Sequence, residues 1–393
     1  MSSSSQAFIP YGRQTISEAD IAAVESVLRS PFLTQGPVTP TFEQAVAAKV
    51  DARYGVAVNS ATSALHVACL ALGLGPGDLL WTSPITFVAS ANCGRYCGAE
   101  VDFVDINPFT GLMDIEALEA KLKIADLEGK LPKILIPVHL TGASCDMESI
   151  NSLAVQYGFY VIEDASHAIG GMYRDRAVGS CAYSQICVFS FHPVKIITSG
   201  EGGMAMTNDT CLYEKMKTLR SHGITKDSDS FVSSPPGAWY YEQQQLGFNY
   251  RMTDMHAALG LSQLERLDEF VKARNIIYKQ YSDTLSSAPL SLLQIPENVL
   301  SSVHLVVVQL HQGFRHLHSV LFNHLSANNV GVQLHYYPVH LQPYYQDLGF
   351  RLGDYPVAEL YSSQSFSIPV HPDLSSSQIK YISNLILNFF DAI

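Results

Sequence analysis

The sequence "VFSFHPVKIITSGEGGMAMTN", residues 188–208, is apolar and strand-like but carries a single lysine. No acidic residue lies within five positions of this lysine, Lys195. Lysine is rarely buried without a partner. One interpretation is therefore a surface loop in which Lys195 keeps its ammonium group in water. The other is a lysine held neutral because its amine takes part in chemistry. This stretch alone favours the surface loop.

On both sides of this stretch, between residue 60 and about residue 210, helix-like and strand-like segments alternate. The strand-like segments are short and almost wholly apolar, which is typical of a parallel sheet covered by helices on both faces. The pattern predicts helices at 62–72, 91–99, 114–122 and 147–158, and strands within 79–87, 100–106, 133–140, 159–168 and 185–191.

The pattern changes in the C-terminal third of the chain. A long connector helix is predicted from residue 254 to about 285, followed by a strand at 304–310, a helix at 315–329 and a strand at 331–340. We therefore predict an α/β protein with a large domain at 1–260, which has a mostly parallel sheet. The connector helix and a smaller α+β domain would occupy 261–393. The first thirty residues, with a helix beginning near Ser17, could pack on either unit.

Composition excludes several classes of protein. Of the 393 residues 47% are hydrophobic and 15% are charged, as in a compact folded protein. The formal net charge of −12 argues against a nucleic-acid partner, because phosphate neutralisation needs a basic face. No apolar run reaches the ~18 residues of a membrane helix, and residues 1–8 lack the apolar core of a secretory signal.

Cysteine and histidine patterns predict neither a disulfide framework nor a metal site. The seven cysteines are scattered without a CxxC pair, so we expect a reducing, cytoplasmic location. His311, His316 and His318 do not share one helix face and have no acidic neighbour, so we expect structural or surface roles for them.

Two carboxylates follow the apolar residues 159–162 in the segment "FYVIEDASHAIG", residues 159–170. Glu163 and Asp164 would lie at the carboxyl edge of the sheet, where open α/β sheets bind ligands. The alternative is an ordinary solvated strand end. Asp164 precedes Lys195 by 31 residues with one strand-like segment between them, so the two side chains could face one cleft.

A candidate phosphate site lies in "VAVNSATSALHVA", residues 56–68, where a strand and a small-residue turn lead into a helix. The free N–H groups at a helix N-terminus, here near Thr62 and Ser63, bind phosphate well. The alternative is simple N-capping by Ser60 or Thr62. The segment "GLGPGD", residues 73–78, follows a helix rather than a strand, so we interpret it as a turn and not as a dinucleotide site.

A lysine amine, a buried carboxylate and a helix-borne phosphate site together match the needs of pyridoxal 5'-phosphate (PLP). The lysine would bond to the cofactor's aldehyde. Asp164 would keep the ring nitrogen protonated, so that the ring draws electrons from the carbon that loses a proton.

Several longer motifs resemble the DegT/DnrJ/EryC1/StrS family of sugar-nucleotide aminotransferases. They are "NSATSALH", "SPITFVASAN", "EDASHAIG", "FSFHPVK", "GEGGM", "LRSHG" and "GFNYRMTDMHAALGLSQL", in this order along the chain. The resemblance extends from about Ile9 to the C-terminus. It implies the fold of PLP-dependent transferases of fold type I, as in aspartate aminotransferase.

The resemblance also implies roles for residues around the cofactor. Lys195 would bond to the cofactor and then move the proton between the donor's Cα and the cofactor. Asp164 would pair with the pyridinium nitrogen. The other implied contacts are Phe87 and His167 at the ring, Thr62, Ser63 and Ser190 at the phosphate, and Asn249, which would reach the phosphate from the neighbouring subunit of a homodimer.

The sequences of three segments are most similar to those of the branch that acts in pseudaminic acid synthesis. These segments are "SFHPVK", "GAWYYEQQQLGFNYRMTD" and "QLHYYPVHLQPYY". This implies transfer of an amino group from glutamate to C4 of a UDP-linked 4-keto-6-deoxy-N-acetylhexosamine. The implied substrate contacts are Tyr11, Thr34, Arg220, His335 and Tyr336.

Other interpretations of the function stay open. The acceptor could be another nucleotide-linked 4-keto or 3-keto sugar. A PLP-binding regulator without activity is disfavoured by the acidic charge balance. The family's dehydratase branch has histidine at the position of Lys195, so the lysine argues against it.

Overall fold

The computed structural model describes residues 7–393, so most of the polar N-terminal tail lies outside it. Its centre is a seven-stranded sheet in the order β1-β9-β8-β5-β4-β2-β3. The strands are β1 (Tyr54–Val58), β2 (Leu79–Thr82), β3 (Glu100–Phe103), β4 (Ile134–Ile136), β5 (Tyr160–Asp164), β8 (Ile186–Ser190) and β9 (Gly203–Thr207). The expected apolar strands are thus present.

The sheet is mostly parallel, as predicted, with one exception. β9 runs antiparallel to both of its neighbours, β8 and β1, whereas the pairs β2–β3, β2–β4, β4–β5 and β5–β8 are parallel. A parallel neighbour would require a long crossover connection. The chain instead turns back through residues 191–202, so the stretch that contains Lys195 is the loop between two antiparallel strands.

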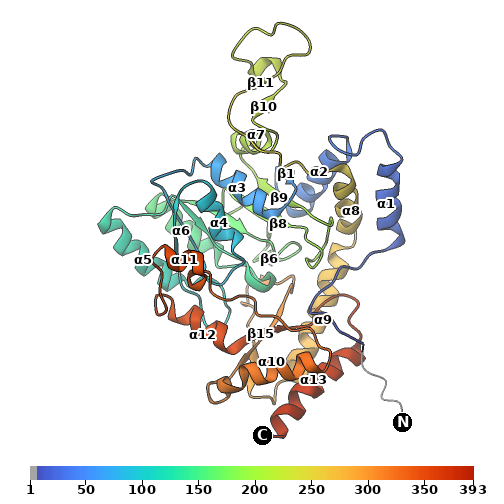
Figure 1. Ribbon diagram of the computed structural model, residues 1–393, viewed down its shortest axis with the longest axis vertical. Coiled ribbons are helices and arrows are strands. Elements are labelled where there is room, and N and C mark those ends of the chain that lie inside the picture. The colour runs from blue at the N-terminus through green and yellow to red at the C-terminus, as the bar shows by residue number, and fades with distance from the viewer. Residues whose placement is uncertain (1–6) are drawn as a thin grey trace.

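Helices cover both faces of the sheet (Figure 1). One face packs on α3 (Ala61–Ala71), α4 (Ala89–Tyr96) and α7 (Thr210–Leu219). The other packs on α5 (Ile115–Glu128) and α6 (Met147–Tyr157) and, towards β1, on α2 (Val38–Val50) and α8 (Asp254–Leu264). Neighbouring strand residues point to opposite faces. Val56 and Val58 therefore join one core cluster while Ala57 joins another.

A second group of elements lies at the lower end of Figure 1. Its antiparallel sheet consists of β12 (Leu290–Leu292), β14 (Val306–Leu310) and β15 (Ser365–Ile368). The core beside this sheet includes residues of α9 (Leu267–Thr284), α10 (His318–Ala327) and α13 (Ser376–Asp391). Two short helices, α11 (Pro343–Asp347) and α12 (Pro356–Gln364), lead the chain back along β3.

Two expectations about this part are wrong. The connector is not one helix, because α8 ends at Leu264 and α9 begins at Leu267. Residues 331–340 do not form a strand and make only an isolated bridge between Gln333 and Ser367. The residues at 333–336 instead line a cavity described below, and this tertiary role overrides the strand propensity of the aromatic and β-branched residues.

The N-terminal segment joins both groups of elements. α1 (Glu18–Leu28) packs on α8, where buried Asp20 accepts hydrogen bonds from Ser262 at 2.6 Å and from Gln263 at 2.7 Å. Earlier in the chain, Ile9 pairs with Val330 of the C-terminal group. The first thirty residues therefore contact both units rather than one.

A hairpin formed by β10 (Ile224–Thr225) and β11 (Glu242–Gln243) projects from the body of the molecule, at the top of Figure 1. Large apolar side chains lie exposed in and beside it: Val232, Trp239, Tyr241 and Leu246. A third small sheet is formed by β6 (Met172–Tyr173), β7 (Arg176–Ala177) and β13 (Val299–Leu300). No helix within residues 7–393 has both the length and the apolarity to cross a membrane.

Asp254 holds the start of α2 against the start of α8. Its carboxylate is buried and accepts from the Val38 N–H at 3.1 Å and from the Thr39 hydroxyl at 2.6 Å. We expect Asp254→Ala to lower the free energy of unfolding by about 2 kcal/mol. The buried Thr39 hydroxyl and the Val38 N–H at the start of α2 would both lose their acceptor. Urea denaturation followed by circular dichroism measures this loss.

The matched control is Asp268→Ala, which also removes a first-turn aspartate. Asp268 pairs with Lys49 at 2.7 Å, but its side chain is 79% exposed, so we expect a change below about 0.5 kcal/mol. Equal losses in the two variants would contradict the assigned role of Asp254.

Candidate active site

A cavity of about 530 Å³ lies at the carboxyl ends of β5 and β8. Its walls come from the large sheet, from the N-terminus of α3, from Tyr11 and from the irregular segment at 333–336. Nine of the residues expected at a site line this one cavity: Tyr11, Thr62, Phe87, Asp164, His167, Ser190, Lys195, His335 and Tyr336.

Lys195 lies in the loop after β8, partly exposed to the cavity. The loop is closed at its base, because the Thr198 hydroxyl and the Ser199 N–H both donate to the Phe191 carbonyl at 3.0 Å. Within residues 7–393 the Lys195 ammonium has no hydrogen-bond or ion-pair partner. Removal from water lowers its pKa to about 8, against a smaller opposing effect of the Asp164 charge. The lysine is therefore not a snorkelling surface residue.

This pKa predicts when the free amine of Lys195 becomes reactive. Burial disfavours the charged form, so the neutral amine should accumulate as pH rises through about 8. An ordinary exposed lysine reaches this point only near pH 10.4. We expect reductive methylation of the cofactor-free protein by formaldehyde to be half-maximal at Lys195 near pH 8, as measured by peptide mass spectrometry.

The control for this measurement is the same protein unfolded in urea. The midpoint at Lys195 should then move up to that of the other lysines. A midpoint that is the same in folded and unfolded protein would show that the cavity does not tune this amine.

Asp164 is the last residue of β5, and its carboxylate is held in two directions. Its Oδ2 accepts from the Ser90 hydroxyl at 2.6 Å, and its Oδ1 accepts from the Ser166 N–H at 3.1 Å. The backbone of Asp164 is fixed as well, since its carbonyl accepts from the His139 N–H at 3.0 Å. The residue is buried yet lines the cavity, as the sheet-edge argument predicted.

The N-terminus of α3 opens onto the cavity. Ser60 caps the helix by accepting from the Ser63 N–H at 3.2 Å, and both Ser60 and Thr62 line the cavity. The close packing of β9 places this end, since a Cβ on Gly203 would lie 2.4 Å from the Ala61 nitrogen. The first N–H groups of α3 are thus available to an anion.

Ser63 does not line the cavity with these residues. Its hydroxyl donates to Asn59 Oδ1 at 2.7 Å and lies 3.1 Å from Ser60 Oγ. Its hydroxyl is engaged in the turn before α3, and its expected contact with a phosphate stays a prediction.

Aromatic and histidine rings form the opposite wall. Phe87 is 59% exposed, and its ring centroid lies 6.3 Å from that of Tyr336. The Tyr336 hydroxyl is 3.2 Å from His167 Nε2, while the buried Nδ1 of His167 has no partner within the described chain. Burial, with the charge of Lys195 and then of His335, lowers the pKa of His167 well below its usual value. His167 is therefore neutral.

The segment that carries Tyr336 also positions His335. His335 Nδ1 lies 2.8 Å from Ser367 Oγ, and its ring centroid is 5.1 Å from that of Tyr11. Burial, and to a lesser extent Lys195, lowers the pKa of His335 to about 3, so this ring is neutral too. Tyr11 is tied to the same unit, because its carbonyl accepts from the Val370 N–H at 2.9 Å.

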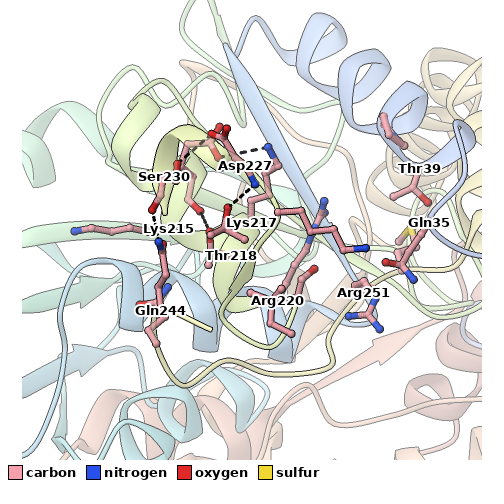
Figure 2. Close-up of a pocket in the computed structure, with 18 of the residues that line it drawn as sticks. Gln35, Thr39, Lys215, Lys217, Thr218, Arg220, Asp227, Ser230, Gln244 and Arg251 are labelled. Atoms are coloured by element: carbon pink, nitrogen blue, oxygen red, sulfur yellow. Dashed lines mark hydrogen bonds and ion pairs between the residues drawn. The ribbon is translucent and has the colours of Figure 1, made fainter. Parts of the chain in front are cut away.

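Three further candidates lie away from this cavity. Thr34 is exposed and pairs with Thr253, and Asn249 is exposed and pairs with Ser221. Arg220 lines a second cavity of about 990 Å³, between α7, the base of the hairpin and residues 35–40 (Figure 2).

Arg220 was expected to contact the sugar nucleotide, and it does not line the cavity that contains Lys195. Its Nη1 is paired with Glu43, which is buried, and donates to the Ala57 carbonyl at 2.6 Å. Glu43 Oε1 also accepts from the Ala57 N–H at 2.8 Å. The guanidinium is therefore engaged in holding α2 against β1.

The structure adds cavity residues that the sequence did not single out. His192 and Glu201 line the cavity from the ends of the loop that carries Lys195. Thr86, Ser166 and Gln333 line it from neighbouring segments. His192 and Glu201 lie within the quoted stretch itself, so their closeness to Lys195 was a usable signal. Gln333 was hidden by the incorrect strand prediction.

These residues fit PLP. Among residues 7–393 the Lys195 amine has no partner, and its pKa is lowered; the Asp164 carboxylate lies in the same cavity, and the N-terminus of α3 is suited to a phosphate. His167 Nδ1 is a buried polar atom that lacks a partner in the part of the chain that the structure describes. No group of three or more His, Cys, Asp or Glu side chains that could hold a metal ion occurs in the described chain.

Comparison with known proteins gives consistent results. Residues 14–387 match the DegT/DnrJ/EryC1/StrS aminotransferase family. The chain is 37% identical to the spore coat polysaccharide biosynthesis protein SpsC of Bacillus subtilis, over 95% of this chain and 94% of the relative. It is 34% identical to the UDP-4-amino-4,6-dideoxy-N-acetyl-beta-L-altrosamine transaminase of Campylobacter jejuni, over 98% of each chain.

Solved structures are similar as well. PseC of Helicobacter pylori, an aminotransferase involved in the biosynthesis of pseudoaminic acid, superimposes with a TM-score of 0.89 at 30% identity, over 98% of this chain and 100% of PseC. The PLP form of the putative sugar aminotransferase Spr1654 of Streptococcus pneumoniae has a TM-score of 0.87 at 27% identity, over 98% of this chain and 100% of that one. A PMP form of Spr1654 is also known.

Proposed function

Because the chain belongs to the DegT/DnrJ/EryC1/StrS aminotransferase family, we propose that it transfers an amino group from glutamate to C4 of a UDP-linked 4-keto-6-deoxy-N-acetylhexosamine. The family makes the protein a PLP-dependent sugar aminotransferase. The proposal adds the identity of the amino donor, the identity of the acceptor sugar and the roles of the residues around the cavity. One observation carries it: Lys195, Asp164 and the N-terminus of α3 converge on a single cavity.

In this proposal each group around the cavity has one task. The α3 N-terminus with Thr62, together with Ser190, holds the phosphate, and Phe87 lies against the ring. Asp164 holds a proton at the ring nitrogen. Bound there, PLP supplies an electron-withdrawing ring that stabilises negative charge at the reacting carbon.

Lys195 is both the attachment point and the base. With a pKa of about 8, its amine can accept a proton from the donor's Cα near neutral pH and return it. His167 and His335 are neutral, so they add no positive charge that would compete for the Asp164 carboxylate. The aromatic wall narrows the entrance and reduces the access of water to the reacting atoms.

We propose that two copies of the chain share their sites. Asn249 is exposed and pairs with Ser221, which lines the second cavity, and it is not among the residues that line the cavity of Lys195. The projecting hairpin nearby exposes Trp239 and Leu246, at 78% and 79%, which is unusual for a surface in water. A second copy that covers this hairpin would also bring Asn249 towards a cofactor phosphate.

Mixing two inactive variants tests this arrangement. Lys195→Ala removes the amine and Asn249→Ala removes the amide. If Asn249 acts across the interface, each hybrid dimer has one site with both native residues. After unfolding and refolding an equal mixture, we expect about a quarter of wild-type activity, from the statistics of random pairing.

The control refolds each variant alone. If Asn249 acts within its own chain, the mixture would stay at the average of the two separate variants.

The acceptor is proposed from two relatives and from the cavity wall. The Campylobacter transaminase and PseC carry the names that point to a UDP-linked amino sugar and to pseudoaminic acid. Tyr11, His335 and Tyr336 offer ring faces and polar atoms on the side of the cavity away from the sheet. The Bacillus relative is named for spore coat polysaccharide, so another nucleotide-linked keto sugar is the alternative acceptor.

The experiment separates donor from acceptor. The purified holoprotein is first mixed with glutamate alone, and we expect the absorbance of the lysine-bound cofactor to be replaced by that of its amine form. UDP- and dTDP-linked 4-keto and 3-keto sugars are then supplied, and products are identified by mass and by NMR at C4. Amination of only a dTDP-linked or a 3-keto sugar would reject the proposed acceptor and keep the aminotransferase.

A further inference from the structure

Glu163 precedes Asp164 in β5, and its buried carboxylate has no task in the proposed transamination. Neighbouring residues of a strand point to opposite faces of the sheet, so the two carboxylates lie on opposite sides of β5. Glu163 Oε2 lies 2.8 Å from Nε2 of His139, whose side chain is fully buried. The other oxygen accepts from the Ser184 hydroxyl. A buried and fully partnered carboxylate therefore lies next in the chain to the residue expected at the ring nitrogen.

His139 connects this carboxylate to the backbone of Asp164. The His139 N–H donates to the Asp164 carbonyl at 3.0 Å, and the Asp164 N–H donates to the Pro137 carbonyl at 3.0 Å. On the imidazole ring, Nδ1 accepts from the Cys145 N–H at 3.2 Å. A backbone N–H can only donate, so the ring proton lies on Nε2 and is donated to Glu163. Both ring nitrogens are thus engaged, and they hold the end of β4 against the end of β5.

The turn after His139 supports the opposite wall of the cavity. The Thr141 carbonyl accepts from the His304 N–H at 2.7 Å. A Cβ on Gly142 would lie 2.9 Å from the His167 carbonyl, so the turn packs closely against this residue. The rings of His167 and His304 are in contact, with centroids 4.3 Å apart. A displacement of the turn would therefore reach His167, which lines the cavity.

We propose that His139 is a positioning residue for the amino transfer: held by Glu163, it sets both Asp164 and His167 in place. The positioning role rests on the proposed function, in which Asp164 holds a proton at the ring nitrogen. Neither His139 nor Glu163 is among the described residues that line the cavity, so both act through their neighbours. In metal sites, the loss of such a supporting partner typically lowers activity about 10- to 100-fold.

The first test uses the cofactor-free protein. In His139→Ala the ends of β4 and β5 lose the ring that joins them. We expect the amide hydrogens of Asp164 and Cys145 to exchange with solvent at least about tenfold faster than in the wild type. Amides of α13 should keep their rates. Hydrogen–deuterium exchange read by peptide mass spectrometry measures this, and an unchanged rate at Asp164 would overturn the assignment.

The second test follows the cofactor in the holoenzyme. The NMR shift of ¹⁵N-labelled PLP reports whether its ring nitrogen is protonated. We expect His139→Ala to lower the protonated fraction and to lower kcat with glutamate about tenfold, while KM stays within about twofold. Glu163→Gln keeps an acceptor for His139, so its kcat should stay within about threefold of the wild type. An equal loss in Glu163→Gln would show that the charge acts rather than the position, and would overturn the assignment.

His340→Ala is the matched control for the loss of a buried histidine. His340 is also fully buried and lies 3.0 Å from a glutamate oxygen, that of Glu359. Its ring contacts Tyr355 and not the strand end that carries Asp164. This variant should lose stability but keep the ¹⁵N shift of the bound cofactor. The same change of shift in both variants would assign the effect to destabilisation and reject the positioning role.

Asp164→Asn is the reference that separates the positioning role from the proposed function. If the ¹⁵N shift changed in Asp164→Asn but not in His139→Ala, the positioning role alone would be rejected. If it changed in neither variant, Asp164 would not act at the ring nitrogen, and both the proposed function of Asp164 and the role of His139 would be rejected.

Discussion

Lys195→Ala is expected to lower the rate of amino transfer at least about 10⁴-fold. The variant loses the attachment point and the base in one change, and within residues 7–393 no other lysine lines the cavity. The cofactor should still bind through its phosphate, because the α3 N-terminus is untouched. Single-turnover kinetics with glutamate measures the effect, and absorbance shows whether the bound cofactor is a free aldehyde.

Lys380→Ala is the matched control, since Lys380 is exposed on α13 and lies far from the cavity in the C-terminal group. It should keep wild-type activity. Added methylamine should partly restore Lys195→Ala by supplying the missing base. A Lys195→Ala variant within tenfold of wild type would refute the proposed mechanism.

The second large effect is expected for Asp164→Asn, about 10³-fold on kcat. The amide has nearly the same shape and can still accept a hydrogen bond from Ser90, but it carries no charge to hold a proton at the ring nitrogen. The loss should therefore appear in the proton-transfer step and much less in KM for glutamate. Stopped-flow absorbance with deuterated glutamate isolates this step.

A cofactor with a permanent charge tests the reason for the loss. N-methylated PLP carries a fixed positive charge at the ring nitrogen, so it should raise the activity of Asp164→Asn above that obtained with PLP. Ser90→Ala keeps the carboxylate and loses only one of its partners, so a smaller loss, of about tenfold, is expected. If the methylated cofactor gave no gain in Asp164→Asn, the carboxylate would act in another way.

Much of the architecture could be predicted from the sequence because its signals are local. Buried strands are short apolar runs, and helices show caps and periodicity, so β2, β3, β4, β5 and β8 and the helices α4, α5 and α6 were expected close to their positions, whereas the short strands β6 and β7 were not predicted. The antiparallel course of β9 was not predicted. Its apolar residues suit either direction, and only the length of the preceding loop distinguishes a turn from a crossover.

What the sequence did not predict depends on contacts that are distant in the chain. The pairing of Arg220 with Glu43, 177 residues away, is one example, because nothing in either motif indicates it, whereas the expected contact of Arg220 with substrate stays a prediction. The segment at 331–340 has a strand-like composition, yet its rings face the cavity. By contrast, Asp164 ends β5 and Lys195 lies in the loop that follows the adjacent parallel strand β8, so the strand order alone predicts that both could face one cleft.

The projecting hairpin gives the protein an internal optical reporter. The sequence contains two tryptophans, Trp81 and Trp239. Trp81 is buried in strand β2 of the sheet, whereas Trp239 in the hairpin is 78% exposed. Emission at long wavelength therefore comes from Trp239, and its shift to shorter wavelength on raising the protein concentration would record the loss of water around the hairpin without any added dye.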